Sequence, residues 1–249
     1  MGAVATADNE AAAAQRGIPG WAHRHRDVSG GWLRPTVFGA VDGLVTNAAL
    51  IAGVGGSGVS PHTVLLTGLA GLVAGAFSMG TGEYVSVTNQ NELVHSEVAL
   101  EADMLARFPA AEQAELADRF RSYGADDDTA TRMAAAVSRD PDQALQLHAR
   151  DELGVDPHDL PSPLLAGGAS LVAFSLGALL PLLPYLLGLR ALLTVSLVIT
   201  AVALLVGGMV VGRLTGRPLL GAGARQLVLG TLAVAVTFAV GHLIGASSA

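Results

Sequence analysis

The chain has 249 residues, of which 51% are hydrophobic and only 14% are charged, and its mean hydropathy is +0.50. This composition is too apolar for an ordinary soluble domain, and the absence of cysteine excludes disulfides, thiolate metal sites and cysteine nucleophiles. The formal net charge is −7, and residues 89–160 alone hold 16 acidic residues against 6 arginines, which argues against nucleic acid and in favour of cations as partners.

Residues 1–34 are polar and rich in alanine, and they contain no apolar core of the kind that a cleavable signal peptide needs. We expect this segment to be disordered and cytoplasmic.

Five later stretches are each long and apolar enough to cross a bilayer, whose hydrocarbon core takes about 20 residues of helix. The alternative, a buried helix of a soluble protein, is hard to reconcile with five such blocks in one chain. The sequence therefore predicts an all-α polytopic membrane protein, with helices 1 and 2 in residues 35–88 and helices 3 to 5 in residues 161–249. The predicted spans are Thr36–Ser57, Thr63–Gly82, Leu164–Leu187, Ala191–Gly212 and Gln226–Gly245.

The placement of arginine predicts the orientation, because loops rich in arginine stay on the cytosolic side. Arginines precede the first span and occupy the connection between the fourth and fifth, whereas the turn between the first and second has none. We therefore expect the N-terminus and the acidic insert, residues 89–160, in the cytoplasm, the C-terminus outside, and the protein in the cell (plasma) membrane. The arginines concerned are Arg24, Arg26, Arg34, Arg213, Arg217 and Arg225.

Four helices are predicted in the insert between spans 2 and 3. The first covers residues 91–107, and Pro109, which suits the first turn of a helix, opens a second over 109–123. Asp128 fits the N-cap of a third helix. A fourth begins at Pro141 and is closed by Gly154 at the C′ position. The insert is thus expected to be a cytoplasmic helical domain.

An ionisable side chain inside the first span points to function. Moving a carboxylate into hydrocarbon costs at least a few kcal/mol, so Asp42 needs a reason to be there. Asp42 lies roughly 10 Å inside from the cytosolic end; Met79 of the second span falls in the same third of the bilayer, and Glu83 follows one turn nearer the cytosol. Oxygen plus thioether suits a borderline ion such as Fe²⁺. Packing is the alternative for Met79 and for Asn47, and an interfacial position for Glu83.

Acidic, histidine and methionine side chains also recur on single faces of the insert helices. Residues three or four apart share a helix face, so three helices can each present ligands to one point. Carboxylates on one face repel one another, and a bound cation would relieve that repulsion; solvated surface charge is the alternative. The pairs are Glu101 with Met104, Glu112 with Glu115, and His148 with Glu152.

The sequence contains neither a serine–histidine–aspartate arrangement nor the histidine-rich spacing of a metalloprotease. An enzyme is therefore not expected.

Four motifs resemble the vacuolar iron transporter family in its bacterial branch, and the resemblance runs from about Trp32 to Gly245. It implies five membrane helices, a homodimer, and export of Fe²⁺, often also of Mn²⁺ or other divalent ions, from the cytosol in exchange for protons. The motifs are DGLVTN (Asp42–Asn47), GLAGLVAGAFSMGTGEYVSV (Gly68–Val87), DELG (Asp151–Gly154) and LGALLPLLPYLL (Leu176–Leu187).

The resemblance also implies roles for single residues. It assigns the translocation aspartate to Asp42 and the methionine of the pathway to Met79. It matches the glutamates of the family's cytoplasmic metal-binding helices to Glu101, Glu112, Glu115 and Glu152.

Three positions depart from that pattern. Met104 stands where a second glutamate is usual, His148 stands where a methionine is expected, and Ala149 replaces a further carboxylate. The cytosolic site therefore has fewer negative ligands than the family pattern.

The sequence thus predicts a proton-coupled exporter of divalent transition metal, in which the acidic insert gathers the ion and passes it to Asp42 and Met79. Ligand types do not choose among Fe²⁺, Mn²⁺, Co²⁺ and Zn²⁺. No permanently bound cofactor is expected, and the partners are metal ions, protons, lipid and a second copy of the chain. The alternative is a membrane-anchored metal buffer or sensor that transports nothing.

Overall fold

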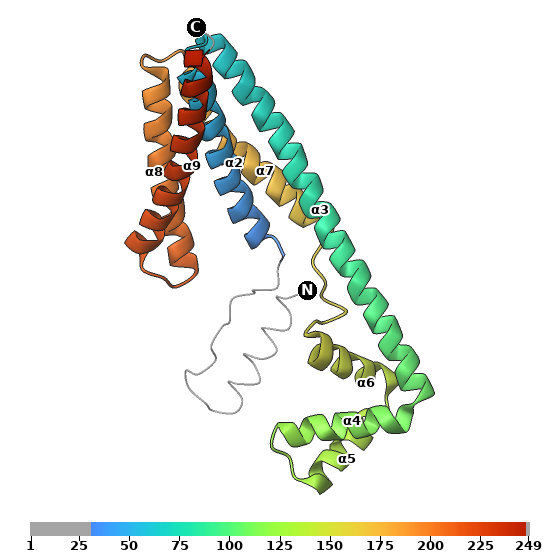
Figure 1. The fold of residues 1–249 in the computed structure, drawn as a ribbon. Helices are drawn as coiled ribbons and strands as arrows, with labels where there is room; N and C mark the ends of the chain where they lie inside the picture. The colour runs from blue at the N-terminus through green and yellow to red at the C-terminus, as the bar shows by residue number, and fades with distance from the viewer. Residues whose placement is uncertain (1–30, 248–249) are drawn as a thin grey trace, which may run out of the picture. The chain divides into compact units, whose positions relative to one another are not determined.

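The computed structural model describes residues 31–247, with side chains up to Gly245, so the expectations for residues 1–30 lie outside the described range. Within that range the chain is helical and contains no strand, which confirms the predicted all-α class. The elements, shown in Figure 1, are α2 (Leu33–Gly56), α3 (Pro61–Arg107), α4 (Pro109–Ser122), α5 (Asp127–Val137), α6 (Pro141–His148), the π-helix η1 (Ala149–Leu153), α7 (Pro163–Leu186), α8 (Leu192–Leu214) and α9 (Leu219–Ser247).

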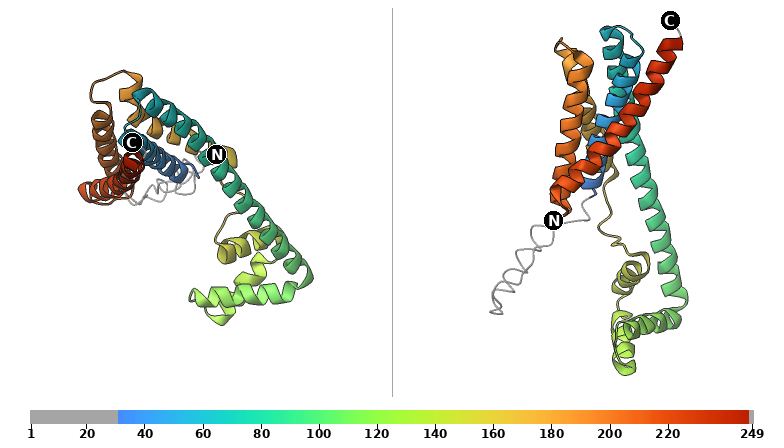
Figure 2. Two further views of the ribbon diagram at one scale, coloured as in Figure 1. Left: turned by 45° about the horizontal axis from the view of Figure 1, so that its top comes forward. Right: turned by 60° about the vertical axis from the view of Figure 1, so that its left-hand side comes forward.

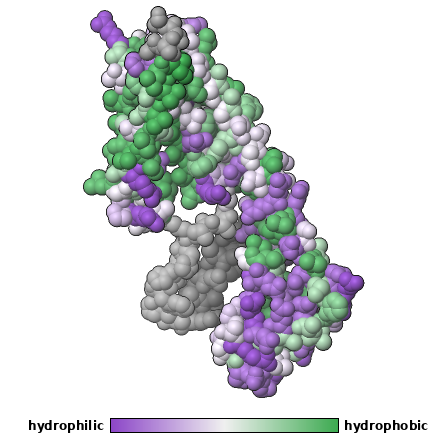
Figure 3. Space-filling view, in the orientation of Figure 1, coloured by the Kyte–Doolittle hydropathy of each residue, from purple (hydrophilic) through white to green (hydrophobic). Residues whose placement is uncertain are grey.

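Five of these helices, α2, α3, α7, α8 and α9, are long and apolar enough to cross a membrane by length and composition. Each overlaps one of the predicted stretches, although Ser57, Leu187 and Ala191 fall one residue outside α2, α7 and α8. Figure 3 shows hydrophobic residues covering α8 and α9, whereas hydrophilic residues gather over the insert helices. Large apolar side chains such as Phe77, Val202 and Leu229 are exposed, as expected for surfaces that meet lipid or another chain.

The fifth apolar helix starts earlier than predicted, at Leu219 instead of Gln226. Arg225 and the glycines before it lower the hydropathy of this first part, but they do not interrupt the helix.

Helix α3 is one continuous helix of 47 residues, whereas the sequence analysis treated the second span and residues 91–107 as separate helices. Between Tyr84 and Arg107 the sequence contains neither proline nor glycine, so the change from apolar to polar residues does not end the helix. At 1.5 Å per residue, α3 is about 70 Å long. One rigid element therefore carries Met79 and Glu101.

Helix α7 packs against both α2 and α3, and its contact with α2 needs glycine. A Cβ atom added to Gly177 would overlap the Ala40 carbonyl and lie 3.0 Å from Leu44 N. Such close backbone approach is typical of membrane helix pairs with small residues at the contact. Figure 2 shows the neighbouring elements from two further directions, with α9 beside α2 and α8.

Two buried polar side chains donate hydrogen bonds to carbonyls of α7, which contains Pro181 and Pro184. Asn47 Nδ2 of α2 donates to Ala178 O at 2.6 Å, and Ser196 Oγ of α8 donates to Pro181 O at 2.8 Å. Prolines remove backbone donors from a helix, and neighbouring side chains commonly bind the carbonyls nearby. Asn47 thus has a packing role in this structure.

The insert helices begin at residues suited to helix starts. Pro109 opens α4 and Pro141 opens α6, as predicted. The N-cap of α5 is Asp126, whose carboxylate accepts from Thr129 N; the predicted Asp128 is wrong because it already lies in the first turn of the helix.

The predicted single helix from Pro141 to Gly154 consists of α6 followed by the π-helix η1. Gly154 ends it with a left-handed φ of 66°, as expected at C′. An apolar cluster joins α4, α5 and α6, and its members are Leu116, Phe120, Ala117, Ala134, Val137 and Leu147.

The contact between α2 and α7 yields a test. Replacing Gly177 with alanine should lower stability by about 1–3 kcal/mol, because the added methyl group overlaps the backbone of α2. Gly168→Ala is the control, since a Cβ atom there meets nothing within 4 Å, and alanine favours the helix by about 1 kcal/mol. The midpoint of thermal unfolding in detergent measures both. Equal shifts for the two variants would contradict the predicted close contact.

Candidate metal site

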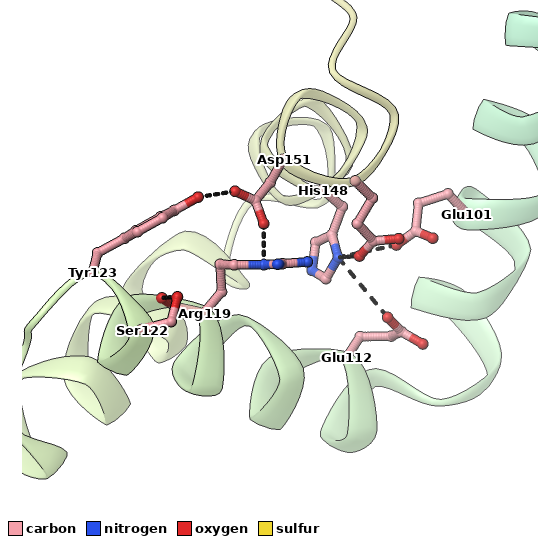
Figure 4. Close-up of polar contacts among 8 residues, drawn as sticks. Glu101, Glu112, Arg119, Ser122, Tyr123, His148 and Asp151 are labelled. Carbon is pink, nitrogen blue, oxygen red and sulfur yellow. Dashed lines mark hydrogen bonds and ion pairs between the residues drawn. The ribbon is translucent and has the colours of Figure 1, made fainter.

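Helices α3, α4 and α6 and the π-helix η1 bring an imidazole and carboxylates together in the insert (Figure 4). His148 Nδ1, at the end of α6, lies 3.1 Å from Glu101 Oε1 of α3 and 3.1 Å from Glu152 Oε1 of η1. Glu112 Oε2 of α4 lies 4.0 Å from the same nitrogen. One ligand atom each from Glu101, His148 and Glu152 lie within 4.8 Å of one another, a spacing that fits a single metal ion.

Local sequence positions each of these side chains. His148 and Glu152 are four residues apart across the junction of α6 and η1, so both lie on the side that faces α3. Phe108 and Pro109 turn the chain sharply from α3 into α4, which places Glu112 in the first turn of α4. Four of the six insert residues predicted from the sequence thereby lie together: Glu101, Glu112, His148 and Glu152.

The cluster is largely withdrawn from water. The side chain of His148 is 3% exposed and that of Glu112 is 8% exposed, whereas Glu152 remains one-third exposed. Glu101 has a pKa above its ordinary value, first because it is buried and then because of the negative charge of Glu152, while His148 acts in the opposite direction. Burial and repulsion both favour the protonated form of a carboxyl group.

Two buried atoms of the cluster, Glu101 Oε1 and His148 Nε2, have no hydrogen-bond partner among the described residues. The hydrogen bond of His148 Nδ1 goes to Glu152, so Glu101 Oε1 receives none despite its proximity. Buried polar atoms are rarely left unpaired, and a bound ion is one explanation. Imidazole with carboxylates suits divalent transition metals.

The other two predicted insert residues are not part of the close cluster. Met104 is half-buried and lies one turn beyond Glu101 on α3, and Glu115 is exposed. The charge of Glu115 nevertheless contributes to the raised pKa of Glu101, so it is near the cluster.

Asp42 lies in a small pocket between α2 and α9. The pocket has a volume of about 200 Å³, and among the described residues that line it, Asp42 and Gln226 are the ones with a charged or amide side chain. Thr46 Oγ1 donates a hydrogen bond of 3.1 Å to Asp42 Oδ1. Neither Thr46 nor Gln226 was predicted as a site residue, although each is a polar residue inside an apolar helix and Thr46 lies one turn from Asp42.

Met79 does not line the pocket that contains Asp42. It contacts an apolar cluster around Phe174 of α7. The ring of Phe174 faces Gly75 of α3 while its backbone faces Gly43 of α2, so α7 lies between the two helices at this level. Glu83 is half-buried one turn further along α3 and also lies outside the pocket.

The chain matches the family model described as the VIT family over residues 33–242. It is 34% identical over 221 residues to vacuolar iron transporter 2 of Oryza sativa subsp. japonica, which covers 87% of this chain and 89% of the relative. It is 36% identical over 232 residues to the vacuolar iron transporter of Acanthamoeba castellanii, covering 91% of this chain and 84% of the relative. Vacuolar iron transporter 1 of Arabidopsis thaliana is 31% identical over 219 residues, covering 87% and 88%.

These matches extend over most of the chain and agree with the resemblance seen in the motifs. Together with the helical membrane architecture, they show that the chain belongs to the VIT family.

Proposed function

We propose that this protein is a membrane transporter that exports divalent transition metal, chiefly Fe²⁺, from the cytosol in exchange for protons. The observation that carries this proposal is the cluster of His148, Glu112 and Glu152 around Glu101, because Glu101 lies on α3, the helix that continues into the apolar bundle. Relatives that bear the name vacuolar iron transporter match most of the chain. A transporter also explains Asp42 in an apolar helix better than a buffer or sensor does, so we do not retain that alternative.

In the first step, the insert gathers the ion. Carboxylates from α3, α4 and η1 together with an imidazole from α6 replace part of its hydration shell. The site supplies oxygen and nitrogen ligands, which accommodate Fe²⁺ and also Mn²⁺, Co²⁺ and Zn²⁺. Met104 and Glu115 lie at its edge and act as further ligands during entry or release.

In the second step, the ion moves between the apolar helices and binds Asp42. An ionised carboxylate binds the metal, and protonation of Asp42 from the outer side releases it, which couples the metal to protons. Thr46 holds the carboxylate, and Gln226 offers a neutral amide oxygen in the same pocket. Met79 and Glu83 of α3 complete the pathway.

A homodimer is part of this proposal. Phe174 of α7 lies between α2 and α3 at the level of Gly43 and Gly75, so one ion contacts both Asp42 and Met79 only if these helices move or if a second copy supplies one of the two side chains. Exposed apolar residues on α3, including Val73 and Phe77, supply a surface for such a contact.

We further propose that residues 1–34 and the insert 89–160 are cytoplasmic, that residues 35–88 and 161–249 form the membrane part, and that the C-terminus is outside. The plasma membrane is the proposed location, although the similar proteins carry the word vacuolar in their names.

Removing the charge of Asp42 tests the pathway. Asp42→Asn should lower Fe²⁺ flux by about tenfold or more, because a neutral amide is a weak ligand and does not exchange a proton. Flux is measured in proteoliposomes with a pH gradient. Asp103→Asn, an exposed aspartate on α3, serves as the control and should transport like the parent. Flux through Asp42→Asn at the parent's rate would contradict the mechanism.

The raised pKa of Glu101 predicts the pH dependence of metal binding. A protonated Glu101 cannot bind the ion, so affinity should fall as pH is lowered through a pKa above the ordinary 4.5. The raised pKa affects folding in the opposite direction. Because the folded state binds this proton more tightly than the unfolded state, the contribution of Glu101 to the free energy of unfolding decreases as pH rises from 4.5 through the raised pKa.

Calorimetric titration of the full chain with Mn²⁺ between pH 4.5 and 7.5 measures this dependence. Glu101→Gln should weaken binding and flatten its pH dependence, whereas Glu92→Gln, an exposed position of α3, should leave both unchanged. Identical pH profiles for the parent and Glu101→Gln would exclude Glu101 as a ligand.

A further inference from the structure

Asp151 lies next to Glu152 in η1, yet its carboxylate is turned away from the cluster around His148 and toward α4 (Figure 4). Its Oδ2 forms an ion pair with Arg119 Nε, and its Oδ1 accepts a hydrogen bond from the Tyr123 hydroxyl. Both oxygens therefore have partners. Asp151 is 15% exposed, less than Glu152, although it is not one of the predicted ligands.

The backbone at Asp151 has an uncommon conformation. The chain changes from α-helix to π-helix between His148 and Ala149, so the wider turn lies between His148 and Glu152. π-Helical turns are rare and occur often at functional sites. A five-residue π-helix needs contacts that hold it in this form, and the two partners of Asp151 provide such contacts.

Helix α4 contacts this region at two levels. Glu112 and Arg119 are seven residues apart, which is two turns, so they lie on the same face of α4 and about 10 Å apart along its axis. Glu112 approaches His148, and Arg119 binds Asp151. Two polar contacts at different heights define both the position and the rotation of α6 and η1 against α4.

We propose that Asp151, Arg119 and Tyr123 position the metal site: they hold η1 on α4 so that Glu152 and His148 face Glu101 and Glu112. This inference rests on the proposed function of that cluster as a metal site. Asp151 is a positioning residue and not a ligand, since both of its oxygens already have partners.

The test uses the full chain in detergent with Co²⁺ alone as the probe, because its visible absorption spectrum reports the ligands around the ion. Asp151→Ala should weaken Co²⁺ binding by about tenfold to a hundredfold, as is typical when a residue that orients metal ligands is removed. The absorption bands of bound Co²⁺ should shift. Tyr123→Phe removes one hydrogen bond, keeps the ion pair with Arg119, and should give a smaller change in the same direction.

Arg121→Gln is the matched control. It lies on the same helix and removes two ion pairs, to Asp118 and Asp127, that do not involve η1. This variant should bind Co²⁺ like the parent and show the same spectrum. A shift for Asp151→Ala without one for Arg121→Gln separates positioning from a general loss of surface ion pairs.

Thermal unfolding of each variant accompanies the titrations. If Asp151→Ala does not fold, Tyr123→Phe decides, because it removes only one hydroxyl group. Parent-like affinity and spectrum in every folded variant would overturn the positioning role while leaving the metal site intact. If the parent itself binds no Co²⁺, the proposed site falls, and the positioning role falls with it.

Discussion

The gathering of carboxylates around a buried imidazole, with Glu101 and Glu112 largely withdrawn from water, is the constraint on which the insert depends. Glu101, Glu112 and Glu152 surround one imidazole, and burial raises the pKa of Glu101. The favourable contacts within that group all involve His148, which forms a hydrogen bond with Glu152 and lies close to Glu101 and Glu112. The apolar cluster of α4, α5 and α6 and the ion pair at Asp151 therefore hold the acidic groups in place. If a divalent ion binds this cluster as proposed, its charge offsets the repulsion among the carboxylates.

The apolar helices also contain polar side chains, and several of these have a hydrogen-bond partner. Asp42 is accompanied by the hydroxyl of Thr46 and faces the same pocket as Gln226. Asn47 and Ser196 instead bind carbonyls of α7 beside its prolines, so their polarity serves the packing of helices. Two neighbouring polar residues of α2, Thr46 and Asn47, thus have different surroundings: one is exposed and reaches Asp42, and the other is fully buried.

Hydropathy and helix-start residues were sufficient to predict the five apolar helices, the starts at Pro109 and Pro141, and the end at Gly154. Spacing along single helices indicated only that His148 and Glu152, and likewise Glu101 and Met104, share a helix face; whether these faces meet depends on tertiary packing. The sequence did not predict that α3 is continuous. The residues become polar after Glu83, which suggested the end of a span, but they still favour a helix, so the helix continues. The π-turn and the contacts of Asp151 depend on residues from different helices, and such tertiary contacts leave no local pattern. The separation of Asp42 from Met79 by Phe174 is likewise a property of packing.

Because α3 is uninterrupted, a tilt of its apolar part also displaces its polar end. Glu101 is 22 residues beyond Met79, which corresponds to about 33 Å of stiff helix. A tilt of about 5° around the bundle end would carry Glu101 sideways by about 3 Å over that length, comparable to the 3.1 Å that separates it from His148. Any small tilt of α3 in the apolar bundle would therefore produce a larger displacement of Glu101, and it would change the distances among the four side chains around His148.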